Sequence, residues 1–96
     1  MRTKLIIVAA ALGLAVAGPV AASPELAKSA GCLTCHNVEG AKKMGASFKD
    51  IGAKYKGKAG AEAGIVEKIK SGKGHPASKA SEDDIKALVK WTLSMG

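Results

Sequence analysis

Aromatic side chains are scarce in this sequence, which holds only Phe48, Tyr55 and Trp91. Three scattered aromatic residues form no aromatic platform among the lysines on which nucleic-acid bases could stack. The single long apolar run, residues 5–18, is shorter than the roughly 18 to 20 residues that a spanning helix needs. No alternating apolar and polar pattern predicts a β-strand. These absences argue against a nucleic-acid-binding domain, a retained membrane span and a β-rich fold.

The amino-terminal segment has the pattern of a secretory signal peptide. Residues 1–4 carry positive charge, residues 5–18 are apolar, and residues 20–22 are small. We therefore predict that residues 1–22 are removed after Ala22, with cleavage after Ser23 as an alternative, and that the protein is periplasmic. The remaining residues, 23–96, are enough for one domain only. A chain this small usually needs a disulfide, a metal or another cross-link to be stable.

Cysteine occurs only twice, within Cys32-Leu33-Thr34-Cys35-His36. This Cys-x-x-Cys-His pattern is typical of covalent haem attachment, in which both thiols add to haem vinyl groups and the histidine ligates the iron. We predict one covalent haem c held by Cys32 and Cys35, with His36 as the proximal ligand. In a chain so poor in aromatic residues, the haem would be the largest apolar object in the core and its binding would be part of folding.

Three other interpretations of the two cysteines are weaker. A thioredoxin-like redox pair needs a strand-helix-strand surround, and the sequence predicts none. A zinc site needs four ligands, and the chain offers only Cys32, Cys35, His36 and the distant His75. A disulfide between Cys32 and Cys35 would close a very short loop, for which the stabilisation is smallest.

Charge is unbalanced toward the basic side, with 15 Lys and Arg against 8 Asp and Glu. Loss of Arg2 and Lys4 with the signal peptide leaves 13 basic residues against the same 8 acidic ones. A basic surface attracts anionic partners, and an acidic protein fits an exported domain better than nucleic acid does. Lysines that only keep the protein soluble remain the alternative.

Helix signals recur along the chain, and each predicted helix but one begins at a serine. Ser23, Ser47 and Ser81 each stand where an N-cap is expected, before Pro24, Phe48 and Glu82. The expected helices run from Ser23 toward Gly31, from Ser47 to Tyr55, from Ala61 to Ser71 and from Ser81 to Ser94. Helices joined by short loops predict a small single all-α domain, with four short helices around the haem.

The residues match a known family over nearly all of positions 23–96. The chain resembles the small bacterial class I cytochromes c in these segments: Gly31-Cys32-x-x-Cys35-His36, Gly45-x-x-Phe48-Lys49-Asp50-Ile51, Ala53-Lys54-Tyr55, Ile69-Lys70-x-Gly72 and Lys90-Trp91-x-Leu93. The resemblance implies the class I cytochrome c fold, with the first and last helices crossing so that Ala30 and Gly31 meet Trp91. It also implies one-electron transfer through an exposed haem edge.

The sequence departs from the family pattern at two places. Ala46 follows Gly45 where the family usually has proline, and its carbonyl would still be available to orient the His36 imidazole. The family's sixth iron ligand is usually a methionine in a proline-rich loop before the last helix. Here that loop is shortened to residues 73–80 and contains no methionine.

His75 is the leading candidate for the sixth ligand because it lies in that loop, between Gly74 and Pro76. Met44 and Met95 are weaker candidates. By the resemblance, Met44 lies on the loop that covers the proximal side, which His36 already occupies, and Met95 lies in the terminal helix. A sixth site that is open or holds water is the remaining alternative.

We therefore expect a monomeric periplasmic electron carrier that is not an enzyme, because no acid, base or nucleophile accompanies the haem motif. Docking to an acidic redox partner is expected through lysines near the haem edge, namely Lys28, Lys42, Lys43, Lys73 and Lys79. A haem-based binder or sensor of small ligands is the rival function, and a subunit docked on a dehydrogenase is a third.

Overall fold

The computed structural model describes residues 21–96, so the predicted signal peptide lies outside the described residues except for its last two positions. The elements are α2 (Pro24–Ser29), the 3-10 turn η1 (Cys32–Thr34), α3 (Phe48–Tyr55), α4 (Ala61–Ser71) and α5 (Glu82–Leu93). Residues 21–96 contain helices and loops but no strand, which confirms the all-α prediction. None of the helices in this part of the chain has the length and apolar character needed to cross a bilayer.

Serine caps begin three of the four α-helices of residues 21–96, as the sequence predicted. In each case the serine hydroxyl accepts a hydrogen bond from a backbone N–H three residues further on, satisfying a donor that the first helical turn leaves free. The pairs are Ser23 with Leu26 at 3.2 Å, Ser47 with Asp50 at 3.1 Å and Ser81 with Asp84 at 3.2 Å.

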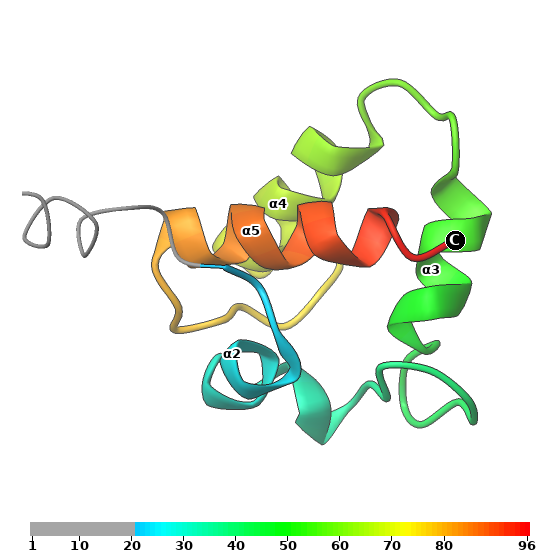
Figure 1. Ribbon diagram of the computed structural model, residues 1–96. Coiled ribbons are helices and arrows are strands. Elements are labelled where there is room, and N and C mark those ends of the chain that lie inside the picture. Colours follow the sequence, from blue (N-terminus) through cyan, green and yellow to red (C-terminus); the bar gives the residue numbers. More distant parts are fainter. Residues whose placement is uncertain (1–20) are drawn as a thin grey trace, which may run out of the picture.

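Helix α5 is the element against which the others pack. Its residue Leu88 joins Ala27 of α2 and Phe48 of α3 in one buried cluster. Ile85 and Val89 form a second cluster with Val66 of α4. Figure 1 shows α5 running across the molecule while α2 is seen nearly along its axis, so the first and last helices cross steeply, as the family resemblance implied.

The contact between these two helices is only partly where we expected it, because Ala30 and Trp91 both pack against the buried cluster of Ala27, Phe48 and Leu88 but Gly31 does not. Ala27 is fully buried against α5, whereas Gly31 is exposed and an added Cβ there would meet no atom within 4 Å. Gly31 instead has a left-handed backbone, with φ of 85°, directly after the C-cap residue Ala30. It therefore serves to end α2, a role for which glycine is the favoured residue.

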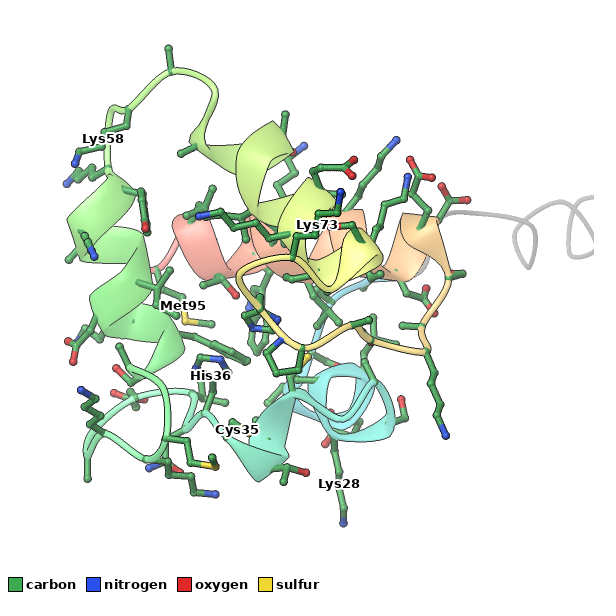
Figure 2. The ribbon with its side chains drawn as sticks, turned by 180° about the vertical axis from the view of Figure 1, so that it is seen from behind. Lys28, Cys35, His36, Lys58, Lys73 and Met95 are labelled. Carbon is green, nitrogen blue, oxygen red and sulfur yellow. The ribbon has the colours of Figure 1, made fainter. Side chains whose placement is uncertain are left out.

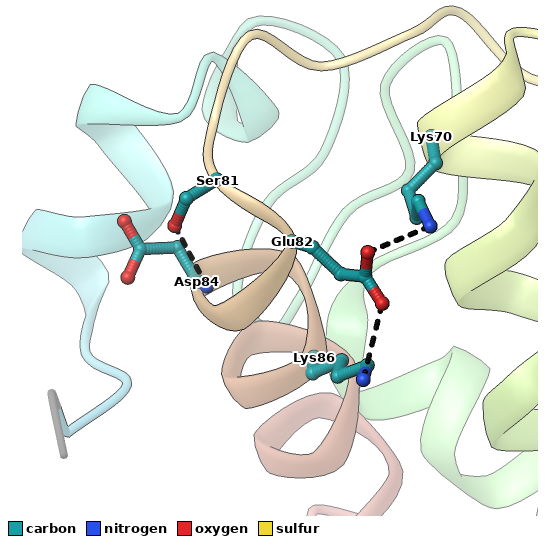
Figure 3. A network of polar contacts seen from close by, with 5 residues as sticks. All are labelled: Lys70, Ser81, Glu82, Asp84 and Lys86. Carbon is teal, nitrogen blue, oxygen red and sulfur yellow. Dashed lines mark hydrogen bonds and ion pairs between the residues drawn. The ribbon is translucent and has the colours of Figure 1, made fainter.

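An exposed ion-pair network links α4 to the first turn of α5 (Figure 3). Glu82 lies 2.8 Å from Lys70 of α4 and 3.1 Å from Lys86, one turn along α5. Hydrogen bonds from Lys70 and Lys86, together with their charges, lower the pKa of Glu82, and the same pairing raises the pKa of Lys70. Because the side chains are exposed, solvent screens this network and its contribution to stability is small.

Candidate functional site

The Cys-x-x-Cys-His segment follows directly from the end of α2. Gly31 turns the chain, and η1 then places the backbone N–H groups of Cys35 and His36 on the same acceptor, the Cys32 carbonyl, at 3.3 and 3.1 Å. Both cysteines are half-buried and unpaired, and burial raises the pKa of the Cys32 thiol. Figure 2 shows Cys35 and His36 next to each other at this turn. One tight turn therefore presents both thiols and the imidazole together.

His36 is held in one orientation by the loop that follows it. Its Nδ1 lies 2.6 Å from the Ala46 carbonyl oxygen, and because a carbonyl can only accept, Nδ1 carries the proton and Nε2 keeps its lone pair. This is the contact that the Ala46 carbonyl was expected to make. The Phe48 ring supports the imidazole from a centroid distance of 5.4 Å. His36 therefore offers Nε2 to a metal, with the supporting hydrogen bond that such ligands usually have.

Gly45 gives the imidazole its space. A Cβ added to Gly45 would lie 2.8 Å from Nδ1 and 3.0 Å from Nε2 of His36, closer than such atoms approach in proteins. The chain must come this near because the Gly45 N–H also donates to the Cys35 carbonyl at 2.9 Å. The site thus contains a backbone cradle that a side chain would fill, built around the predicted proximal ligand His36.

The rest of this loop is tied down on both sides. Its backbone hydrogen bonds join Phe48 to Asn37 at 2.9 Å and Lys49 to Val38 at 3.0 Å. The Lys43 ammonium group donates to the Leu33 carbonyl, between the two cysteines, at 3.0 Å. The half of the site that carries His36 is therefore held in place by contacts within the polypeptide itself.

His75 lies opposite His36, on the loop between α4 and α5. The two imidazole planes are parallel to within 2°, and their centroids are 6.0 Å apart. The His75 Nδ1 donates to the Pro76 carbonyl at 2.7 Å, so here too Nε2 is the free nitrogen. The donor set fits a haem iron by its chemistry, because each imidazole has its Nδ1 on a backbone carbonyl and its Nε2 free, and a neutral imidazole nitrogen is a common iron ligand.

Neither methionine candidate lies on the loop that carries His75. Met44 is 82% exposed, and its sulfur is 3.8 Å from the Cys35 sulfur, on the loop that holds His36. Met95 is half-buried and packs against the cluster of Ala27, Phe48 and Leu88 beside the end of α5 (Figure 2). The structure therefore brings His75, and neither methionine, into a stacked arrangement with His36.

The alternative interpretations of the cysteines gain nothing from the geometry. Cys32 and Cys35 are not joined to each other. Within residues 21–96, no group of three or more His, Cys, Asp and Glu side chains could hold a metal ion by itself. The same residues contain no strand that could frame a thioredoxin-like pair.

Sequence reasoning missed two features of the site. It matched Gly45 to the family pattern without assigning it a role, because only the folded chain brings its backbone against an imidazole nine residues away. It also passed over Ser78, which lies in a polar stretch with no pattern of its own and makes a hydrogen bond to Ala30. Nothing in the local sequence around Ser78 predicts that contact.

Comparisons with known proteins identify relatives over most of the chain. Cytochrome c-551 of Pseudomonas aeruginosa is 39% identical over 85 residues, covering 80% of this chain and 81% of that protein. Cytochrome c-552 of Nitrosomonas europaea is 38% identical over 103 residues, covering 99% of both chains. The crystal structure of the class 1 cytochrome MtoD from Sideroxydans lithotrophicus superposes with a TM-score of 0.61 at 38% identity, covering 74% of this chain and 89% of that one. No family model matches the sequence.

A helical domain with a Cys-x-x-Cys-His turn and a carbonyl-oriented histidine defines a c-type haem protein. The chain belongs to the small class I cytochromes c, the monohaem family to which these relatives belong. It carries one covalent haem c and is an electron carrier that exchanges electrons with redox partners. The comparisons do not favour the rival function, a binder or sensor of small ligands.

Proposed function

We propose that this protein is a periplasmic one-electron carrier whose haem is attached through Cys32 and Cys35 and ligated by His36 and His75. The haem, when bound, supplies an iron that gains and loses one electron. The chain's own residues fix the orientation of the two imidazoles and surround the site with helices. The stacked pair of His36 and His75 is the observation that carries the proposal.

The hydrogen bonds of both histidines support this pair of axial ligands. Each Nδ1 donates to a backbone carbonyl, Ala46 for His36 and Pro76 for His75, so each ring is held in the tautomer that binds metal through Nε2. Two neutral imidazoles already oriented by the backbone would need little rearrangement when the iron changes charge. That property suits an electron carrier better than a protein that must open its iron to bind a ligand.

The identity of the sixth ligand would set the potential. A methionine thioether raises the reduction potential of a cytochrome c. An imidazole is a stronger donor and favours the ferric state. A chain with His75 in that position should therefore have a lower potential than relatives with a methionine ligand.

Docking to an acidic redox partner is proposed through lysines near the attachment turn. Lys28, Lys42, Lys43, Lys73 and Lys79 are all exposed. The hydrogen bond from Lys43 to the Leu33 carbonyl keeps one positive charge beside the two cysteines. Positive charge at this place would guide an acidic partner toward the haem edge and raise the association rate.

The docking proposal can be tested with two double variants of equal net charge. Lys28→Gln/Lys42→Gln removes charge near the attachment turn, whereas Lys56→Gln/Lys58→Gln removes it at the turn between α3 and α4, which lies far from Cys35 in Figure 2. Stopped-flow electron transfer with an acidic partner should slow more for the first pair. Equal slowing would mean that only net charge matters.

Export to the periplasm is proposed from residues 1–22, most of which lie outside the described part of the structure. Haem attachment can be tested on protein produced with its export machinery. If Cys32 and Cys35 form thioethers, acid and organic solvent should leave the haem on the chain. A polypeptide mass without haem would contradict the attachment.

The axial ligand is tested by comparing His75→Ala with Met44→Leu in the ferric holoprotein. The first should turn the spectrum high-spin and create a site for added ligands, while the second should leave it unchanged. If His75→Ala keeps the wild-type spectrum and potential, His75 is not the ligand. If the wild-type spectrum is itself high-spin, binding of small ligands becomes the better-supported function.

A further inference from the structure

We infer that Ser78 is a positioning residue that fastens the loop of residues 73–80 to the haem-attachment segment and thereby keeps His75 in place. This inference rests on the proposed role of His75. Ser78 itself is half-buried and lies three residues after His75. It touches neither imidazole in the hydrogen-bond pattern, so its effect on the site is through the loop.

Ser78 joins three segments of the chain through hydrogen bonds. Its hydroxyl donates to the Ala30 carbonyl at 2.9 Å and accepts from the Ala80 N–H at 3.1 Å. Its own backbone N–H donates to the Ile69 carbonyl in the last turn of α4 at 3.1 Å. One small residue therefore connects the loop to the end of α2, to the end of α4 and to the segment that leads into α5.

The position of Ala30 shows which parts of the site this hydrogen bond connects. Ala30 is the C-cap of α2, where carbonyls have no partner within the helix, and it comes two residues before Cys32. A hydrogen bond from Ser78 to Ala30 thus joins the loop that carries His75 to the segment that carries Cys32, Cys35 and His36. The two sides of the haem site are tied together across 48 positions of the sequence.

The other side-chain hydrogen bonds of the loop are local. The His75 Nδ1 donates to the adjacent Pro76 carbonyl, and the Ser71 hydroxyl accepts from the Lys73 N–H at 3.2 Å. Gly72 and Gly74 have left-handed backbones, with φ of 79° and 81°, and both are exposed. Among the side-chain hydrogen bonds of residues 21–96, the one from Ser78 is the link between this loop and the attachment segment. Without it, the His75 end of the loop could lift away more often.

The expected effect follows from the usual strength of one hydrogen bond. Losing a single neutral hydrogen bond changes an equilibrium by about two- to tenfold. Ser78→Ala should therefore raise the fraction of molecules whose loop is open, and in which His75 is off the iron, by that factor. Most molecules would still be closed, so the spectrum at rest should stay low-spin while ligand entry becomes faster.

The experiment measures cyanide binding to the ferric holoprotein by stopped flow. We expect Ser78→Ala to bind cyanide about two- to tenfold faster than the wild type, and Ser78→Thr, which keeps the hydroxyl, to bind at close to the wild-type rate. Ser29→Ala is the matched control, because Ser29 also donates its hydroxyl to a backbone carbonyl, that of Leu26 at 3.1 Å, but within α2. It should leave the rate unchanged.

The outcomes separate this inference from the proposal on which it rests. If Ser78→Ala lowers the urea midpoint but binds cyanide at the wild-type rate, Ser78 is merely structural and the inference is wrong. It is equally wrong if Ser29→Ala accelerates binding as much. His75→Ala is measured alongside: if it alone accelerates cyanide binding, only the role of Ser78 fails. If His75→Ala leaves the rate of cyanide binding unchanged, His75 is not the ligand, and the inference about Ser78 is then wrong as well.

Discussion

Replacing Gly45 by alanine should disturb the proximal side of the haem site more than any other single methyl group added nearby. The new Cβ would lie 2.8 Å from Nδ1 and 3.0 Å from Nε2 of His36, where ordinary contacts begin at 3.4 Å. The ring or the loop would have to retreat by about half an ångström or more, the kind of overpacking that typically costs 1–3 kcal/mol. The backbone angles of Gly45 are not in the left-handed region, so the effect isolates the contact with the imidazole.

Neither side of this contact can yield freely. The Gly45 N–H donates to the Cys35 carbonyl at 2.9 Å, and the Lys43 N–H donates to the Gly45 carbonyl at 3.1 Å. The imidazole is fixed by its hydrogen bond to Ala46 at 2.6 Å. A ring pushed away from Ala46 becomes a poorer electron donor, so the reduction potential should rise as stability falls.

Urea unfolding and potentiometry of the holoprotein measure the two effects together. With a slope of about 1 to 2 kcal/mol per molar urea, a loss of about 2 kcal/mol lowers the midpoint by about 1 to 2 M. Gly64→Ala is the matched control, since Gly64 lies inside α4 with nothing within 4 Å of the added Cβ. It should stabilise the protein by up to about 1 kcal/mol. A Gly45→Ala protein with wild-type midpoint and potential would refute the reasoning.

Three further predictions concern the whole domain. The chain without haem should be mostly unfolded, because residues 23–96 bury little apolar surface; native-like helical content by circular dichroism would contradict this. Electron transfer with an acidic partner should slow as the salt concentration rises, because at about 0.15 M salt the attraction between exposed charges extends only about 8 Å. A rate that does not change with salt would mean that the lysines have no docking role. Glu82→Gln should lower the urea midpoint slightly at neutral pH, whereas Asp83→Asn should not, because Asp83 forms no ion pair within residues 21–96. Because the folded state lowers the pKa of Glu82, its stabilisation is present above the unfolded value of about 4.3 and fades as pH falls through the lower folded value. A difference that persisted in strong acid would show another cause.

The elements of the fold could be predicted because their signals are local. Ser47 and Ser81 cap the helices that the sequence assigned to them, and the predicted helix from Ala61 to Ser71 has the bounds of α4. A cap and an apolar stripe within a dozen residues are enough to specify a helix. The haem motif was equally readable, because its chemistry depends on the spacing of Cys32, Cys35 and His36 alone.

Contacts between distant segments could not be read in this way. Ala27 and not Gly31 meets α5, because the end of α2 is decided by a left-handed turn that leaves Gly31 exposed. The approach of Gly45 to His36 and the bond from Ser78 to Ala30 both depend on loops folding back onto the attachment segment. Small and polar residues in loops carry no periodic signal, so their partners are known only once the chain is folded.

The ferric spectrum of the purified wild-type holoprotein, in the visible and near-infrared, tests the central claim most directly. A haem held between His36 and His75 should be six-coordinate and low-spin, without the sulfur-to-iron charge-transfer band that marks a methionine ligand. A spectrum with that band would mean that a methionine binds the iron. A high-spin spectrum would mean that His75 does not, and either result would contradict the account.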